Sequence, residues 1–232
     1  KGTDVLFLNV DPSGLINLQQ LEDAISGATS LVSIQWVNNE TGVIQPIEEI
    51  SQICRSKGVL FHTDAAQAIG KIEVNVESLP IDFLTLTGHK FHAPSGVGAI
   101  YAKNLNALSP LMFGGPQELG LRPGTENLLG IVGIGKAAEL RKANFLNVKR
   151  KTTEMRDSFE EKILQNIPNS KINGHPKDRT GNSTNILFNG INGQALVVRL
   201  DQMGIRCSQS AACTNMKPEP SHVLRAMGLS EE

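Results

Sequence analysis

Short apolar runs alternate with amphipathic stretches through the first half of the sequence, and this alternation limits the fold more than any other feature. The runs are rich in branched residues and are VLFLNV (5–10), LVSIQWV (31–37), VLFHTDA (59–65), IDFLTLT (81–87) and VGAIYA (97–102). Strands that are apolar on both faces are typical of a mostly parallel sheet covered by helices. We therefore expect an α/β fold, a mostly parallel sheet flanked by helices, with right-handed crossovers.

Two of the intervening helices have recognisable ends. Asn17 followed by Gln20 forms a capping-box pattern, which predicts that a helix begins there. Pro46 is expected at the first position of the next helix, and Gly58 ends it. Beyond a Gly/Pro-rich loop (113–127), the pattern predicts long helices over 128–167, a strand over 184–189, a helix over 193–204 and a strand over 205–210.

The change in pattern predicts two domains. We place the boundary between Asn144 and Lys151, which gives a large domain over 1–146 and a smaller C-terminal α/β domain over 147–232. The sequence begins without an initiator Met and ends in a helix-like AMGLSEE, so we expect a piece of a longer chain in which both domains are incomplete.

Composition argues against several classes of partner. The net charge of the 232 residues is −1 and aromatic residues make up only 4%, which favours neither a nucleic-acid surface nor a stacking platform for single strands. No stretch approaches the roughly 20 apolar residues that cross a bilayer, so we expect no membrane partner. Three cysteines form no paired framework, which indicates a reducing compartment: the cytoplasm, or the mitochondrion in a eukaryote.

Polar residues follow the expected strands at their carboxyl ends, where open α/β sheets bind ligands. Asn39 follows the run at 31–37, Asp64 and Gln67 follow the next, and Lys90 follows LTLT. Each has a simpler explanation on its own, since an aspartate at a strand end commonly caps a helix and a lysine is commonly solvated. Together they match the needs of pyridoxal phosphate, which requires a lysine amine for a Schiff base and a carboxylate beside its ring nitrogen.

The sequence gives weaker support for metal binding and for dinucleotide binding. His89 and His92 are suited to a metal ion, but no third ligand lies nearby at metal-site spacing, so we expect no metal. The segment GIGKAA (133–138) imitates a dinucleotide-binding fingerprint, but a helix rather than a strand precedes it.

Five longer motifs resemble those of a known enzyme family. VNNETGVIQPI, HTDAAQAIGKI, LTGHKFHAPSGVGAIY, GGPQELGLRPGTENLLGIVGIGKA and CSQSAACTNMKPEPSHVLRAMG together resemble cysteine desulfurases of the NifS/IscS type. These are fold-type I pyridoxal-phosphate enzymes related to class V aminotransferases. The resemblance covers nearly all of the sequence, and the motifs stand in family order.

The resemblance implies a role for each matching residue. Lys90 would form the Schiff base and then move the substrate α-proton, Asp64 would pair with the pyridine nitrogen, and Asn39 and Gln67 would bind the phenolic oxygen. The residues that would hold phosphate are Thr87, in place of the more usual serine, His89, and Thr125, which would reach the site of the other subunit of a homodimer.

Cys213 is the implied nucleophile. In the family this thiol attacks the sulfur of bound L-cysteine, becomes a persulfide and leaves L-alanine, whereas Cys54 and Cys207 are expected to pack in a helix and a strand. The sequence has Ser210-Ala-Ala before Cys213 where the family usually has Gly-Ser-Ala. The long segment around Cys213 resembles the group that passes sulfur to iron–sulfur scaffold or sulfur-carrier proteins, for cluster assembly or tRNA thiolation.

The resemblance also implies that two residues of the family's active site lie outside these 232 residues. The histidine that stacks on the cofactor would precede Lys1 and the arginine that binds the substrate carboxylate would follow Glu232, so we expect these 232 residues alone to bind cofactor weakly. Three alternatives remain open: a selenocysteine lyase that uses the same residues, a class V aminotransferase that needs no thiol, and a non-catalytic binding module.

Overall fold

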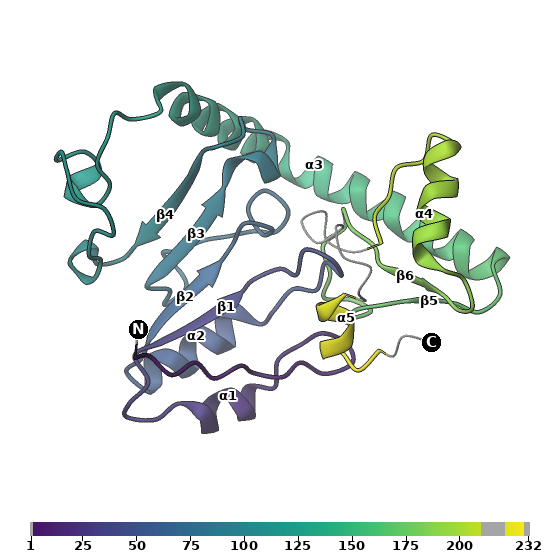
Figure 1. The fold of residues 1–232 in the computed structure, drawn as a ribbon, viewed down its shortest axis with the longest axis horizontal. Coiled ribbons are helices and arrows are strands. Elements are labelled where there is room, and N and C mark those ends of the chain that lie inside the picture. The colour runs from purple at the N-terminus through teal and green to yellow at the C-terminus, as the bar shows by residue number, and fades with distance from the viewer. Residues whose placement is uncertain (1, 210–220, 230–232) are drawn as a thin grey trace. The chain divides into compact units, whose positions relative to one another are not determined.

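The computed structural model describes residues 2–209 and 221–229. Figure 1 shows the helices and strands in chain order: α1 (Leu18–Ala24), β1 (Leu31–Gln35), α2 (Ile47–Ser56), β2 (Leu60–Asp64), β3 (Phe83–Thr87), β4 (Gly98–Ala102), α3 (Leu128–Asn166), β5 (Ser170–Ile172), β6 (Ile186–Phe188), α4 (Gly193–Gln202) and α5 (His222–Ala226). Three short 3₁₀ helices add to these: η1 (Gly88–Phe91), η2 (Leu105–Ala107) and η3 (Glu118–Gly120).

The chain forms two compact units. The first unit comprises Lys1–Asp23, Val37–Gln45 and Val148–Glu232, and the second comprises Ala24–Trp36 and Pro46–Asn147. The second unit holds the larger sheet. The division into domains at 146/147 that the sequence suggests stays a prediction.

The larger sheet is mixed and mostly parallel, as expected. Its strands lie in the order β1-β2-β3-β4, and β4 alone runs antiparallel to its neighbour. Asp64 at the end of β2 lies opposite Gln35 of β1 and Thr85 of β3. The carboxyl ends of the three parallel strands therefore meet at one edge of the sheet.

One face of this sheet forms the core of the second unit with α2. Phe61 and Leu84 are buried on that face, and Ile47, Ile50 and Cys54 form the buried stripe of the helix. The spacing of these three residues places them on one side of an α-helix, and their removal from water drives the packing.

The ends of two helices can be compared with the sequence. Asn17 Oδ1 accepts a hydrogen bond from Gln20 N at 3.0 Å, which confirms the predicted N-cap. Pro46 is the N-cap residue of α2 rather than its first helical residue, so that prediction was wrong by one position. Gly58 adopts a φ of +69° just after the C-cap Lys57, as a helix-ending glycine does.

Two predicted strands do not form. In the 5–10 run only Val10 makes a bridge, to Ile16, while Val5, Leu6 and Phe7 are exposed. Residues 205–209 are irregular, with Cys207 exposed. Apolar composition alone does not make a strand, because the backbone also needs a hydrogen-bonding neighbour along its length, and among the described residues only Ile16 forms a bridge to either run.

The first unit contains the two-stranded antiparallel sheet of β5 and β6 and a buried ion pair. Both terminal nitrogens of Arg179 donate to the Glu160 carboxylate at 2.8 Å, and Thr184 Oγ1 donates to the same group. This bidentate geometry ties α3 to the segment that precedes β6.

Candidate active site

Asp64 and Lys90 lie at the carboxyl ends of neighbouring parallel strands. Asp64 is the last residue of β2, and Lys90 belongs to η1, which follows β3 directly. The half-buried Asp64 accepts a hydrogen bond from Ala66 N through Oδ1 at 2.8 Å, so it caps the following turn. No described residue donates to its Oδ2, which leaves one carboxylate oxygen for a ligand.

Close packing around Gly88 fixes the short helix that carries Lys90. A Cβ at Gly88 would lie 2.9 Å from Ala93 Cβ and 3.2 Å from Ile134 Cδ1. Phe91 is buried, while His89 and Lys90 are exposed between these two anchors. The Gly-His-Lys-Phe sequence therefore fixes η1 at both ends and directs its two basic side chains to the surface.

Thr87 and His89 form a polar pair beside the lysine. The distance between Thr87 Oγ1 and His89 Nδ1 is 3.0 Å. One of these two groups donates to the other, so the neutral pair keeps one donor for an anion. The pair is therefore chemically suited to an anionic ligand.

Lys71 and Arg141 are functional candidates that the sequence did not single out. Burial lowers the pKa of Lys71 to about 8, with further lowering from the positive charges of Lys90 and Arg141. None of the three cations forms an ion pair with an acidic side chain in the described part of the chain. A concentration of positive charge without such a counter-ion favours an anionic ligand.

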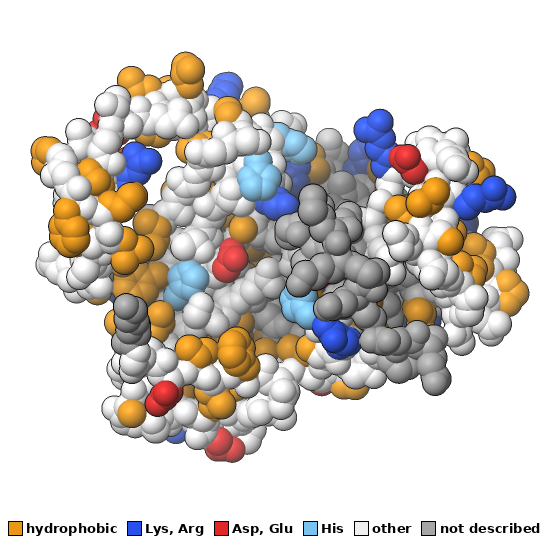
Figure 2. Space-filling view, in the orientation of Figure 1, with side chains coloured by type: hydrophobic (Ala, Val, Ile, Leu, Met, Phe, Trp, Pro, Cys, Tyr) orange, Lys and Arg blue, Asp and Glu red, His pale blue; other side chains and the backbone are white. Residues whose placement is uncertain are grey.

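A polar network covers part of the sheet face on which Asp64 lies. His62 Nδ1 lies 2.8 Å from Ser33 Oγ, and His62 Nε2 lies 3.2 Å from Thr85 Oγ1. Burial lowers the pKa of His62, although the Asp64 carboxylate opposes this shift, so the ring favours its neutral form. Figure 2 shows histidine and acidic side chains over the strands on the viewed face. The histidine links three strands, and neither of its neighbours was predicted as a site residue.

Asn39 belongs to the other compact unit and is held by its neighbours. Asn38 Oδ1 accepts hydrogen bonds from the backbone N–H groups of Glu40 and Thr41, at 2.9 and 3.0 Å. Glu40 and Thr41 are buried, whereas the Asn39 side chain is exposed at the tip of this turn. The sequence following β1 thus presents Asn39 outward from a rigid turn.

The other predicted residues are Thr125 and the three cysteines. Thr125 is exposed on the 113–127 loop, near Gly124, whose N–H donates to Gln117 Oε1 at 3.2 Å. Cys213 lies outside the described residues. Cys54 is fully buried in α2, in agreement with its predicted packing role, but Cys207 is exposed and lies in no strand.

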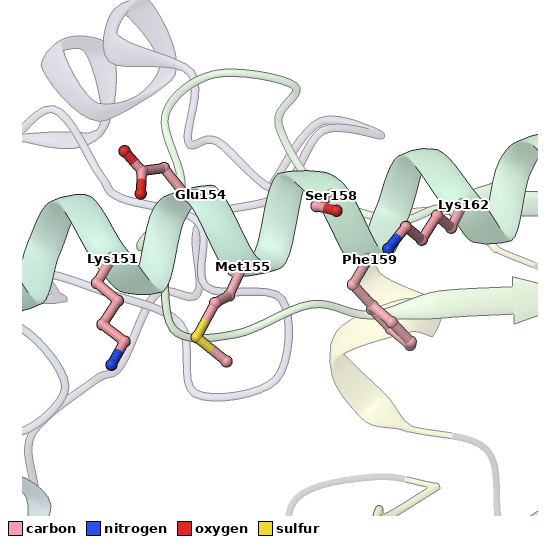
Figure 3. Close-up of a pocket in the computed structure, with 6 residues that line it drawn as sticks. All are labelled: Lys151, Glu154, Met155, Ser158, Phe159 and Lys162. Atoms are coloured by element: carbon pink, nitrogen blue, oxygen red, sulfur yellow. The ribbon is translucent and has the colours of Figure 1, made fainter.

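A shallow pocket of about 400 Å³ runs along α3 but contains none of the predicted site residues. Lys151, Met155 and Phe159 point to the same side of the helix there (Figure 3). Within residues 2–209 and 221–229, no three His, Cys, Asp or Glu side chains are grouped to hold a metal ion. The helices described include none with the length and apolar character needed to span a bilayer.

The chain belongs to the class-V aminotransferase family, whose model matches residues 1–230. It is 48% identical over 229 residues to cysteine desulfurase 2 of Trichormus variabilis, covering 99% of this chain and 57% of that relative. A solved NifS-like protein superposes with a TM-score of 0.90 at 34% identity, over 99% of this chain and 60% of that one.

A second solved structure, SspA in complex with cysteine, has a TM-score of 0.82 at 38% identity, over 99% of this chain and 63% of that one. These similarities agree with the fold and the family that the motifs indicate. The chain spans a little over half the length of the curated relative described above.

Proposed function

We propose that this chain forms the cofactor-binding and thiol-bearing part of a pyridoxal-phosphate-dependent cysteine desulfurase. The observation that carries the proposal is the placement of Asp64 and Lys90 at the ends of adjacent parallel strands. Similarity to a named cysteine desulfurase at 48% identity supports it.

The residues present fit this cofactor. Asp64 keeps one carboxylate oxygen without a described donor, which suits a protonated ring nitrogen. Thr87 and His89 suit phosphate oxygens, and the uncompensated positive charge of Lys71, Lys90 and Arg141 suits a ligand with several negative charges. Lys90 would hold the aldehyde carbon through its amine, and Gln67 and Asn39 would donate to the phenolic oxygen.

The cofactor would supply an electron sink that allows bonds at the substrate Cα and Cβ to break. The Lys90 amine would take the proton from the substrate Cα, and Asp64 would keep the ring nitrogen protonated. The thiolate of Cys213 would attack the substrate sulfur: an S–S bond would form, the substrate Cβ–S bond would break, and a proton added at Cβ would complete alanine. The sulfur would then remain on Cys213 as a persulfide.

We also propose that the protein acts as a homodimer and passes its sulfur to a partner protein. Thr125 completes the phosphate site of the second subunit in a homodimer, a role supported by its exposed position on a long loop. The persulfide passes to an iron–sulfur scaffold or a sulfur-carrier protein. A thiol-dependent cycle of this kind suits a reducing compartment such as the cytoplasm.

The test uses L-cysteine and the full-length protein, as wild type and three variants, reconstituted with pyridoxal phosphate, since these 232 residues alone are expected to bind it weakly. We expect equal amounts of alanine and transferable sulfur, loss of the cofactor's visible band in Lys90→Ala, and loss of sulfur transfer but not of the band in Cys213→Ala. Cys54→Ala is the control and should keep both. Full activity in Cys213→Ala would favour an aminotransferase, and release of selenide without release of sulfide would favour a selenocysteine lyase.

A further inference from the structure

Gln67 presents a problem of orientation at the proposed site. A carboxamide has an oxygen that accepts hydrogen bonds and an NH₂ group that donates them. Only the NH₂ end stabilises an anionic phenolic oxygen, and a rotation of the amide by a half-turn would present the wrong end. Some neighbouring group must therefore select one orientation if Gln67 is to assist the cofactor.

Lys71 favours one orientation of the Gln67 carboxamide. Its Nζ donates a hydrogen bond to Gln67 Oε1, four residues earlier in the chain. A protonated amine has three donors and no acceptor, so it binds only the oxygen end of the amide. The NH₂ group of Gln67 then faces away from Lys71, and no described residue accepts from it.

The backbone around Lys71 is itself held in place. Lys71 N donates to Ala68 O at 2.9 Å, which closes the turn after Asp64. On the other side, Arg141 Nε donates to the carbonyl oxygen of Gly70. Gly70 has a φ of +75°, and a Cβ there would lie 2.7 Å from Arg141 Cγ. The α3 residue Arg141 thus packs against a position whose positive φ and close contacts favour glycine.

We propose that Lys71 is a positioning residue that holds the Gln67 carboxamide with its NH₂ group toward the phenolic oxygen of the cofactor. The inference rests on the proposed function, because it assumes that this cofactor binds here. It assigns Lys71 a role through Gln67 rather than direct contact with substrate. Lys71 and Gln67 should therefore act as one unit.

A double-mutant cycle in the reconstituted protein tests the proposal. The variants are Lys71→Met, Lys71→Arg, Gln67→Ala and the Lys71→Met/Gln67→Ala double variant, with the exposed Lys103→Met as matched control. Two quantities are measured at one fixed pH: the Kd of pyridoxal phosphate for the apoprotein and the position of the bound cofactor's visible absorption band. Thermal unfolding of each apoprotein shows that the variants fold.

We expect Lys71→Met to weaken cofactor binding about tenfold, the effect of one hydrogen bond to a charged group, and to move the absorption band. Lys71→Arg should restore most of both, since it keeps a donor. In the Gln67→Ala background, Lys71→Met removes only a positive charge and no positioning contact, so it should weaken binding by less than about twofold. Equal effects of Lys71→Met with and without Gln67, or an unchanged band, would overturn the positioning role. A wild-type protein that binds no cofactor would instead overturn the proposed function itself.

Discussion

The hydroxyl of Ser221 donates a buried hydrogen bond of 2.5 Å to the carboxylate of Glu40, which lies 181 residues earlier in the chain. The same hydroxyl accepts from the backbone N–H groups of Val223 and Leu224 and so caps α5. Glu40 also directly follows Asn39, the residue proposed to contact the cofactor. One serine therefore joins the start of α5 to the turn that presents Asn39.

Ser221→Ala should lower the free energy of unfolding by about 2 kcal/mol or more. The change removes a helix cap, worth about 1 kcal/mol, and deprives a buried carboxylate of its donor, worth about 1–3 kcal/mol. Urea denaturation of the whole protein measures the loss. The exposed Ser208→Ala should change stability by less than about 0.5 kcal/mol. A similar small loss in Ser221→Ala would show that the Glu40 bond contributes little.

Gly88→Ala should disturb the helix that carries Lys90. The added Cβ would meet Ala93 and Val97 at 2.9 and 3.1 Å, so η1 must shift, at a cost of about 1–3 kcal/mol. Because Lys90 moves with η1, we expect weaker cofactor binding, measured from the visible band. Gly135→Ala in α3 is the control: a Cβ there meets nothing within 4 Å, and alanine stabilises helices by up to about 1 kcal/mol. Equal cofactor binding in the two variants would contradict the packing argument.

The buried Glu160–Arg179 pair should make stability depend on acid pH. Burial raises the pKa of Glu160, but hydrogen bonds from Arg179 and Thr184 and nearby positive charges lower it by more, so this pKa lies below its ordinary value of 4.5. A depressed carboxyl pKa means that the stabilisation is present above about pH 4.5 and is lost as the pH falls through the folded-state value. Denaturation curves of wild type and Glu160→Gln should therefore converge below that pH.

Replacing Arg179 gives a second measure of how much the Glu160–Arg179 pair contributes to stability. Arg179→Met leaves a buried carboxylate without its bidentate partner and should cost about 3–5 kcal/mol. The matched control is Arg150→Met, whose 3.0 Å pair with Glu154 is exposed and should contribute less than about 1 kcal/mol. Comparable losses in the two variants would mean that burial does not strengthen the inner pair.

The two described cysteines should differ sharply in reactivity. Burial, together with the negative charge of Asp82, raises the pKa of Cys54 to about 11, and its side chain is fully buried. Cys207 is exposed. Because the thiolate is the reactive form, iodoacetamide should label Cys207 in the native protein and Cys54 only after unfolding, as peptide mass spectrometry would show. Rapid labelling of Cys54 in the native state would contradict its burial.

The sequence predicted those parts of the site that depend on strand order. Asp64 and Lys90 follow successive strands, and the ends of parallel neighbours must meet at one edge. It did not predict Lys71 or Arg141, because a single lysine or arginine carries no signal until packing brings it beside others. The steric need for Gly88 likewise depends on Ile134, a residue of a distant helix. The 5–10 run has the composition of a strand, but among the described residues only Ile16 pairs with it, and composition does not show whether a pairing partner exists.

The four strands of the larger sheet lie side by side in the order in which they are synthesised. Each new strand pairs with the one made just before it, so every pairing closes a local loop, and the entropy lost in closure grows only slowly with loop length. Growth from one edge lets these strands assemble one at a time as the nascent chain leaves the ribosome. By the time Ala102 has emerged, all four described strands of the sheet that presents Asp64 and Lys90 have been synthesised.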